Sequence, residues 1–321
     1  MLQLDDSRWE LLARVAHLYY KKNRTQAEIA RLLDISRPQV SRLLAESRES
    51  GVVEINIRYP KNTLSTVRQD LLDTFELKSA SILSASDLGY AQLQEQLGIL
   101  AARQLETELA DGMTMGISWN TGVYQVVKAL QAARRENVTV VQLTGAVGTI
   151  NPLIDGPDLT RWLAQSLGAQ YKYLHAPMLV ESAATRDVLM KDRSVREPLV
   201  LLENMDIALV GIGSLIPTLA GLLRAGLVSE GELREIVRQG GVGEVCGYHY
   251  NLRGEVLPLE LHERIIGVTL DMLKKAPFVI GVGGSIHKAS AILGALRLGI
   301  LDCLITDEIA ARAVLKMAGQ D

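Results

Sequence analysis

The sequence predicts an α/β protein in two parts, a small helical domain over residues 1–59 and a larger domain over residues 60–321. Three observations predict this organisation. Residues 25–44 have the pattern of two short capped helices joined by a tight turn. Beyond residue 60, short apolar runs alternate with amphipathic segments, which is typical of a doubly wound parallel sheet covered on both faces. A length of 321 residues also favours two domains.

The small domain begins with a helix that we expect over residues 7–22. Its apolar face is formed by Trp9, Leu12, Val15, Ala16 and Tyr19, which recur at a spacing near four. We expect this helix to pack across the two that follow it as a third helix.

Each of the next two helices begins with a capping box, in which two residues three apart satisfy each other's backbone N–H groups. Thr25 and Glu28 form the first box, and Ser36 and Gln39 form the second. Asp34 lies in the turn, where a residue must tolerate an unusual backbone angle. The residues expected to lock the two helices together are apolar: Ile29, Leu32, Leu33, Val40, Leu43 and Leu44.

The second of these helices presents polar and basic side chains outward. Residues 21–48 contain seven Lys or Arg and three Asp or Glu, in a chain of net charge −3. A local basic field of this kind favours contact with phosphates, and Arg, Gln and Ser suit base edges. An αα-hairpin in a helical core would need no such face. We therefore predict a helix-turn-helix that contacts double-stranded operator DNA through Arg24, Thr25, Ser36, Arg37, Gln39, Ser41 and Arg42.

The end of the small domain is indicated by alternating residues and then by proline. Residues 52–58 alternate apolar and polar positions, which predicts a strand belonging to a wing. Pro60 interrupts both kinds of regular structure, so we place the boundary at residues 59–62.

The larger domain alternates predicted strands and helices along its length. The expected strands lie at residues 79–84, 113–118, 138–143, 206–212, 276–282 and 301–306. The expected helices lie at residues 90–109, 122–133, 157–167, 182–190, 230–238, 285–297 and 307–318. Ligands of such sheets bind at the carboxyl ends of the strands, so the turns that follow the strands are candidate binding segments.

Four such turns carry glycine or polar residues, at 116–122, 142–148, 240–247 and 281–288. The first offers Ser118, Asn120 and Thr121 at the start of a helix, which suits an anion. Glu244 lies among the glycines of the third, and Lys288 lies in the first helical turn after the fourth, where the helix dipole disfavours a cation. These five residues predict a site for a polyol that carries a phosphate or another negative group. For the second turn, tight-turn geometry alone is an equally good explanation of its glycines.

Other classes of site find little support in the sequence. Neither Gly211–Gly213 nor Gly281–Gly284 completes a nucleotide-binding glycine motif. The histidines have no partner that marks a nucleophile, and Cys246 and Cys303 lack metal-ligand spacing, so we expect no catalytic residues, metal or cofactor. No apolar run approaches the roughly 20 residues that a membrane helix requires, and the acidic N-terminus is unlike a secretion signal. We therefore expect a cytoplasmic protein without membrane contact.

The chain resembles the SorC/DeoR-type sugar-responsive bacterial regulators over nearly its whole length. In the small domain the resemblance lies in residues 19–21, 25–30 and 36–44. In the larger domain it lies in residues 118–119, 142–143, 176–178, 206–213, 241–247 and 304–308. It implies a winged helix-turn-helix joined to an effector domain similar to ribose-5-phosphate isomerase and to CoA-transferase-like sugar-binding domains. It also implies a homo-oligomer, commonly a tetramer, that binds operator DNA and responds to a sugar, often a phosphorylated one.

Carried over position by position, the family's pocket involves Ser118, Asn120, Thr121, Glu244 and Lys288. The family often reads Trp-Gly followed by two hydroxyl residues, whereas this chain has Trp119-Asn120-Thr121-Gly122 and so lacks one of the two hydroxyls. A free sugar and a sugar phosphate therefore both stay open as effectors. Two other functions also stay open: a sugar-phosphate isomerase with a DNA-binding head, in which Glu244 is the base and Lys288 the electrophile, and an oligomerisation scaffold with a vestigial pocket.

Overall fold

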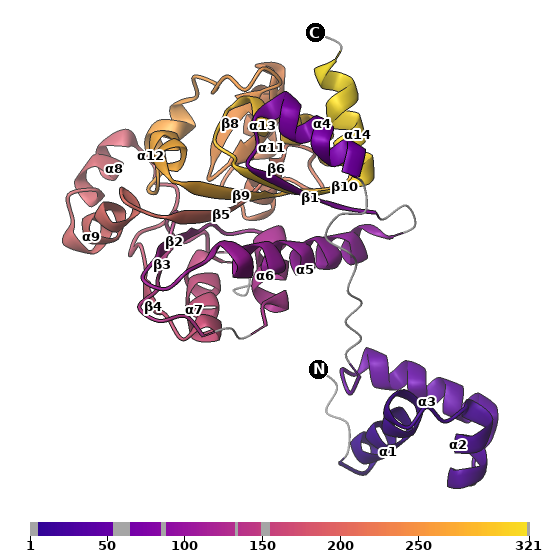
Figure 1. Ribbon diagram of the computed structural model, residues 1–321. Helices are drawn as coiled ribbons and strands as arrows, with labels where there is room; N and C mark the ends of the chain where they lie inside the picture. The colour runs from indigo at the N-terminus through magenta and orange to yellow at the C-terminus, as the bar shows by residue number, and fades with distance from the viewer. Residues whose placement is uncertain (1–5, 54–64, 85–87, 132–133, 149–154, 320–321) are drawn as a thin grey trace. The chain divides into compact units, whose positions relative to one another are not determined.

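The computed structural model describes residues 6–53, 65–84, 88–131, 134–148 and 155–319. The chain divides into two compact units, Met1–Arg58 and Tyr59–Asp321, one residue before the predicted division. The helices and strands of both units are labelled in Figure 1. Within the described residues, no helix is both long enough and apolar enough to span a bilayer.

The N-terminal unit contains α1 (Asp6–Ala16), a π-helical turn η1 (His17–Lys21), α2 (Gln26–Leu33) and α3 (Arg37–Glu49). Both capping boxes form as predicted. Thr25 N–H donates to Glu28 Oε2 at 2.8 Å, and Ser36 N–H donates to Gln39 Oε1 at 2.8 Å. Asp34 ends α2 in the left-handed conformation with φ of 54°, which lets the chain reverse into α3.

The core of this unit is a small apolar cluster formed by Leu12, Val15, Ile29, Val40, Leu43 and Leu44. The prediction that Leu32 and Trp9 belong to this core is wrong, because Leu32 is 59% exposed and Trp9 is 43% exposed. The packed face of α2 runs through the buried Ile29 and the half-buried Leu33, four residues apart, and Leu32 falls outside it. The predicted wing strand falls mostly on residues 54–58, which lie outside the described residues, and residues 52–53 are bends.

The C-terminal unit is built on a seven-stranded sheet in which every described pair of strands is parallel. Its order is β1 (Ser79–Leu83), β10 (Cys303–Asp307), β9 (Phe278–Val282), β5 (Ile207–Gly211), β2 (Thr114–Ile117), β3 (Thr139–Gln142) and β4 (Gln170–Lys172). The six predicted strands all form. The edge strand β4 was not predicted, because its three residues are polar or aromatic and exposed rather than part of a buried apolar run.

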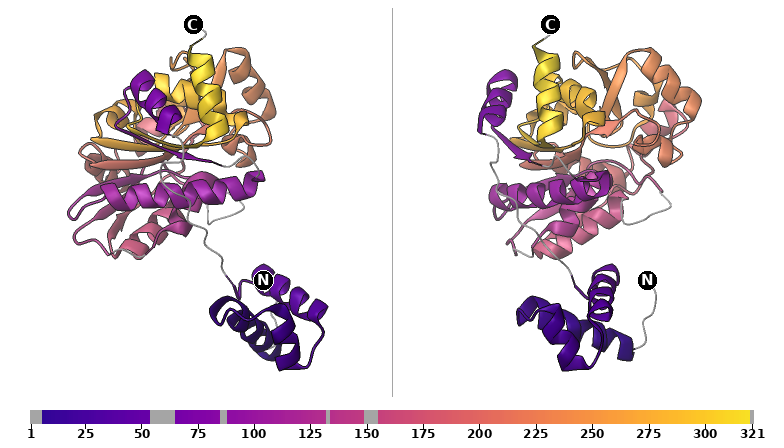
Figure 2. Two further views of the ribbon diagram at one scale, coloured as in Figure 1. Left: turned by 45° about the vertical axis from the view of Figure 1, so that its right-hand side comes forward. Right: turned by 90° about the vertical axis from the view of Figure 1, so that its right-hand side faces the viewer.

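Helices cover both faces of this sheet (Figures 1 and 2). One face carries α5 (Tyr90–Glu108), α6 (Thr121–Ala129) and α7 (Gly156–Leu167). The other carries α4 (Ser65–Phe75), α9 (Arg193–Leu202), α13 (Ala289–Arg297) and α14 (Glu308–Ala318). Alternate residues of one strand serve the two cores: Ala208 and Val210 face the second group of helices, and Ile207 and Leu209 face the first. The α/β prediction is therefore confirmed.

The remaining helices of this unit are short. They are α8 (Ala183–Leu189), α10 (Gly221–Arg224), α11 (Glu230–Arg238), α12 (Leu270–Lys275) and the 3-10 turns η3 (Glu260–Arg264) and η4 (Ile286–Lys288).

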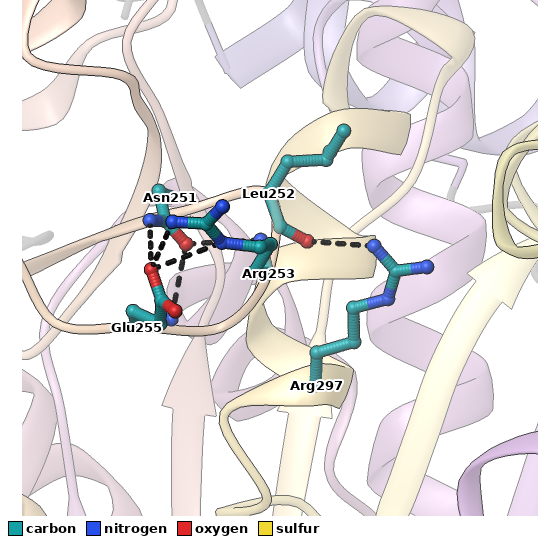
Figure 3. A network of polar contacts seen from close by, with 5 residues as sticks. All are labelled: Asn251, Leu252, Arg253, Glu255 and Arg297. Atoms are coloured by element: carbon teal, nitrogen blue, oxygen red, sulfur yellow. Dashed lines mark hydrogen bonds and ion pairs between the residues drawn. The ribbon is translucent and has the colours of Figure 1, made fainter. Parts of the chain in front are cut away.

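A second, three-stranded antiparallel sheet packs beside α13. It consists of β6 (Gly213–Ser214), β7 (Gly241–Val245) and β8 (Tyr248–Asn251). The turn that follows β8 is held together by Glu255, which accepts hydrogen bonds from Asn251 and Arg253 (Figure 3). Arg297 of α13 donates to the carbonyl of Leu252 at 3.1 Å, which fastens this turn to the main body of the unit.

Candidate functional site

The strand order identifies the place where a ligand of this sheet should bind. From β2 the chain proceeds through β3 to β4 at one edge, and from β5 it proceeds through β9 to β10 toward the other. The neighbouring strands β2 and β5 are therefore the point at which the order reverses. Open α/β sheets bind their ligands outside the carboxyl ends of the strands at such a point. The segments that follow β2 and β5 are Ser118–Asn120 and Ile212–Gly213.

Ser118 and Asn120 both reach across to the end of β5. The buried Ser118 hydroxyl accepts a hydrogen bond from Gly211 N–H at 3.2 Å. Asn120 caps α6, with Oδ1 accepting from Val123 N–H at 2.8 Å. Its amide lies so close to Gly211 that a Cβ added there would be 1.4 Å from Asn120 Nδ2. Thr121 begins α6 with an exposed side chain and joins none of these contacts in the described part of the chain.

Glu244 approaches the same segment from the small sheet. The prediction that it lies in a turn after a strand of the main sheet is wrong, because it lies within β7 and pairs with Gly213 of β6. Its Oε2 accepts from Gly247 N–H at 2.9 Å. A Cβ added to Gly213 would be 1.8 Å from Glu244 Oε1, so the carboxyl group lies directly over this glycine. Four glycines within β7 and its flanks let the strand pack closely, and they resemble a turn in sequence.

Lys288 completes the cluster from the β9 side. It is the last residue of η4 and lies immediately before α13, with 8% of its surface exposed. Its Nζ donates to the carbonyl of Ile212 at 2.7 Å. Burial lowers the pKa of Lys288 to about 8, and the nearby Glu244 carboxylate opposes that shift. Burial likewise raises the pKa of Glu244, against the Gly247 hydrogen bond and the Lys288 charge.

The structure thus gathers Ser118, Asn120, Glu244 and Lys288 around three residues, Gly211–Gly213. We call this group the switch-point cluster. From the sequence, this glycine pair was interpreted as an incomplete nucleotide motif and as part of the family resemblance, and its contacts with the predicted effector residues were missed. The sequence feature that could have indicated these contacts is a pair of glycines flanking one apolar residue at the end of a fully buried strand. Both positions must lack a side chain because the side chains of Asn120 and Glu244 lie against them.

In the glycine-rich turn after β3, the backbone N–H groups bind a side chain of the protein itself. Asp155 is buried and accepts hydrogen bonds from the N–H groups of Val147 and Gly148, each at 2.8 Å. It also accepts from Gly156 N–H at 2.7 Å, at the start of α7. The protein's own carboxylate therefore fills the position that an anionic ligand would take in this turn. Sequence reasoning missed Asp155 because it lies seven residues beyond the turn that it closes.

A cavity of about 580 Å³ lies next to the switch-point cluster. Its lining includes Ser214 and His287, the chain neighbours of Gly213 and Lys288, but none of the five predicted effector residues. The rest of the lining combines apolar side chains, among them Leu215, Leu223 and Leu233, with the polar residues Glu230, Arg234 and Ser290. Four of the five predicted effector residues lie in the cluster and none lines the cavity, so the cluster is the candidate effector site.

In the N-terminal unit, all seven residues predicted to contact DNA are exposed. Arg37 and Arg42 lie on α3, and Arg24 precedes α2, where it pairs with Glu28 at 3.3 Å. Gln39 has a second role that limits it, because its Oε1 already accepts the N–H of Ser36. A bidentate contact between Gln39 and adenine would use the same oxygen, which would then accept from both the cap and the base.

Comparison with known proteins identifies the family. Residues 60–316 match the family model of a sugar-binding domain. The chain belongs to this family. It is 35% identical over 313 residues to the transcriptional regulator LsrR of Enterobacter sp. strain 638. That match covers 97% of this chain and 94% of LsrR. It is 30% identical to the sorbitol operon regulator of Klebsiella pneumoniae, over 97% of this chain and 99% of that protein.

The fold agrees with these relatives. The crystal structure of the full-length sorbitol operon regulator SorC from Klebsiella pneumoniae superposes with a TM-score of 0.72 at 28% identity. The match covers 97% of this chain and 100% of that one. The resemblance to SorC-type regulators is therefore confirmed.

Proposed function

We propose that this protein is a DNA-binding transcriptional regulator of a carbohydrate-utilisation operon, and that a sugar or sugar phosphate alters its affinity for the operator. Residues 1–59 bind DNA as a winged helix-turn-helix, and residues 60–321 bind the effector and form the oligomer. The observation that carries the proposal is the exposed basic face of α3 in a chain whose remainder is a sugar-binding domain. Its matched relatives are themselves named regulators.

The α3 face supplies the DNA contacts. Arg37 and Arg42 provide positive charge for phosphates and donors for guanine, and Ser41 lies between them in the sequence. One reading head of this size touches too few base pairs to be selective, so recognition requires several copies. We propose a tetramer in the cytoplasm, as the resemblance implies.

An Arg42→Ala variant tests the DNA-binding half. Loss of a base or phosphate contact costs about 1–3 kcal/mol, which is roughly 5- to 150-fold in Kd. Binding to the promoter fragment of the protein's own operon is measured by gel shift at two salt concentrations. Arg48→Ala serves as the control, because it removes the same charge from the same helix at an exposed site six residues away. Equal operator affinity in the Arg42 variant and the wild type would contradict the proposal.

The switch-point cluster supplies the effector contacts. Glu244 accepts hydroxyl hydrogens, and Lys288 neutralises an anionic group. The cluster lies at the end of β2 and β5, where sugar-phosphate-binding sheets of the ribose-5-phosphate isomerase type are expected to hold ligands, and we propose that kinship for this domain. Ligand binding shifts the population between DNA-competent and DNA-incompetent arrangements.

A thermal-shift screen of the full-length protein against free sugars and sugar phosphates identifies the effector class. The active compounds are then titrated by calorimetry into Glu244→Gln and Lys288→Met, which keep approximate side-chain size. We expect both variants to lose the effector response while operator binding persists. Native-like sugar affinity in both would show that the pocket lies elsewhere.

One observation favours an enzyme as the second candidate. Opposite pKa shifts on a neighbouring carboxyl group and amine are also typical of acid–base catalysis. In an isomerase, Glu244 would move the proton and Lys288 would polarise the carbonyl. Incubating the full-length protein with pentose and hexose phosphates and following isomer formation separates the two functions. Turnover that Glu244→Gln abolishes would favour the enzyme.

A further inference from the structure

The segment that carries Lys288 contains a residue in an unfavourable conformation. Ser285, two residues into the loop after Gly283, has φ of 84° and ψ of 146°. This region is populated almost entirely by glycine, so serine persists there only where its surroundings hold it.

Asp307 provides that restraint. It ends β10, is 2% exposed, and accepts the Ser285 N–H at Oδ2 at 2.5 Å. Its other oxygen, Oδ1, accepts the N–H of Ala310 at 3.1 Å and so caps α14. One buried carboxyl group therefore fixes both the loop after β9 and the start of a helix after β10. Nothing in the sequence links position 307 to position 285.

Ser285 in turn determines the position of Lys288. Its hydroxyl accepts from His287 N–H at 3.4 Å, and its carbonyl accepts from Lys288 N–H at 2.9 Å. These bonds close the η4 turn, from whose last residue the lysine side chain extends to the Ile212 carbonyl. A rotation at Ser285 would therefore displace the ammonium group from the switch-point cluster.

The same carboxyl group caps α14, a helix that contacts α4. Figure 2 shows the C-terminal helix α14, in yellow, on the same side of the sheet as the purple α4, and the two helices are in contact. The first described helix after the N-terminal unit is α4. Movement of the loop that carries Lys288 would therefore also shift α14 and could displace α4, which contacts it.

We propose that Asp307 is a positioning residue of the effector site: by holding Ser285 in its glycine-like conformation, it places Lys288 in the switch-point cluster. It touches no effector itself. The inference rests on the proposed function only in taking Lys288 as an effector contact. The positioning can be measured without any sugar.

The first test variant is full-length Asp307→Asn. Asparagine caps helices as well as aspartate, so its oxygen can keep the Ala310 bond. The NH2 group of the asparagine then faces the Ser285 N–H. Both are donors, so the Ser285 N–H loses its hydrogen-bond acceptor. The matched control is Glu308→Gln, which removes the same charge from the next residue, whose carboxylate pairs with Arg312 at 2.9 Å instead.

Two readouts report on the loop. Hydrogen exchange of the peptide over residues 283–290 should accelerate at least tenfold in Asp307→Asn, while the α14 peptide keeps its protection. Trace labelling with acetic anhydride, quantified by mass spectrometry across pH 6–10, should show Lys288 titrating closer to an ordinary lysine. Glu308→Gln should match the wild type in both. An Asp307→Asn profile that also matches the wild type would overturn the proposal.

A glycine at position 285 distinguishes positioning from a general structural role. Glycine adopts the observed angles without strain, so Ser285→Gly in the Asp307→Asn background should restore most of the wild-type Lys288 labelling profile. Should Asp307→Asn alone fail to fold, the double variant still has to fold and show this profile. Failure to restore it would overturn the proposal. If the labelling behaves as expected but no sugar raises the wild-type melting temperature, the proposed effector function is wrong and the positioning role is not.

Discussion

Gly211→Ala is the sharpest test of how the switch-point cluster is built. A Cβ at this position would lie 1.4 Å from Nδ2, 2.3 Å from Cγ and 2.6 Å from Oδ1 of Asn120. Gly211 itself cannot move away, because it belongs to the central strand β5 and pairs with Val282. The Asn120 side chain must therefore rotate and give up its bond to Val123.

The expected cost follows from that lost cap. Losing an N-cap interaction destabilises a protein by about 1 kcal/mol, within a range of roughly 0.5–2 kcal/mol. For a unit of this size, each kcal/mol corresponds to a fall of about 2–4 °C in melting temperature. Urea denaturation measures the free energy of unfolding directly. Gly231→Ala is the control, since the nearest atom to a Cβ at that helical glycine is Ser229 Oγ at 3.8 Å, an ordinary contact distance. Alanine there should be neutral or stabilising.

A double-mutant cycle identifies the cause. Asn120→Ala removes the amide that the new methyl group would strike, so Gly211→Ala should cost almost nothing further in that background. The coupling free energy between the two positions should then be about 1 kcal/mol. If Gly211→Ala costs as much in the Asn120→Ala background as in the wild type, the damage comes from the strand and the reasoning is refuted.

Two further predictions concern pH. Because the pKa of Lys288 is lowered to about 8, the residue loses its charge as pH rises through 8. An anionic effector should therefore bind more weakly at pH 9 than at pH 7 by calorimetry, and Lys288→Arg should flatten this dependence. The stacked pair His249 and His262 is the second case, because burial lowers their pKa values to about 3 and about 4. The unfolded chain then binds more protons than the folded one below pH 6.5, so the free energy of unfolding should fall from pH 6.5 to pH 4. His249→Gln should reduce that slope in urea titrations, and an unchanged slope would exclude the pair as its source.

Local patterns determined much of the fold. Both capping boxes and the left-handed Asp34 follow from residues at most three apart, and they form as the sequence predicts. Most positions of the six main strands are apolar, because strands buried on both faces favour apolar residues. Strands that are exposed or rich in glycine were missed, because they lack such an apolar run. The strand β4 lies at the edge of the main sheet, and the glycines of β7 form a sequence pattern that is typical of a turn.

The candidate residues were also found in the sequence, but their arrangement was not. Ser118, Asn120, Glu244 and Lys288 were each noticed beside a glycine or a helix start, which are local signals. That they converge on Gly211–Gly213 depends on which strands are neighbours, and residue order does not encode this. The same holds for Asp155 and Asp307, whose partners at Gly148 and Ser285 lie 7 and 22 residues away. Helices and turns form from neighbours along the chain, whereas a binding site forms from segments that only the packing of the sheet brings together.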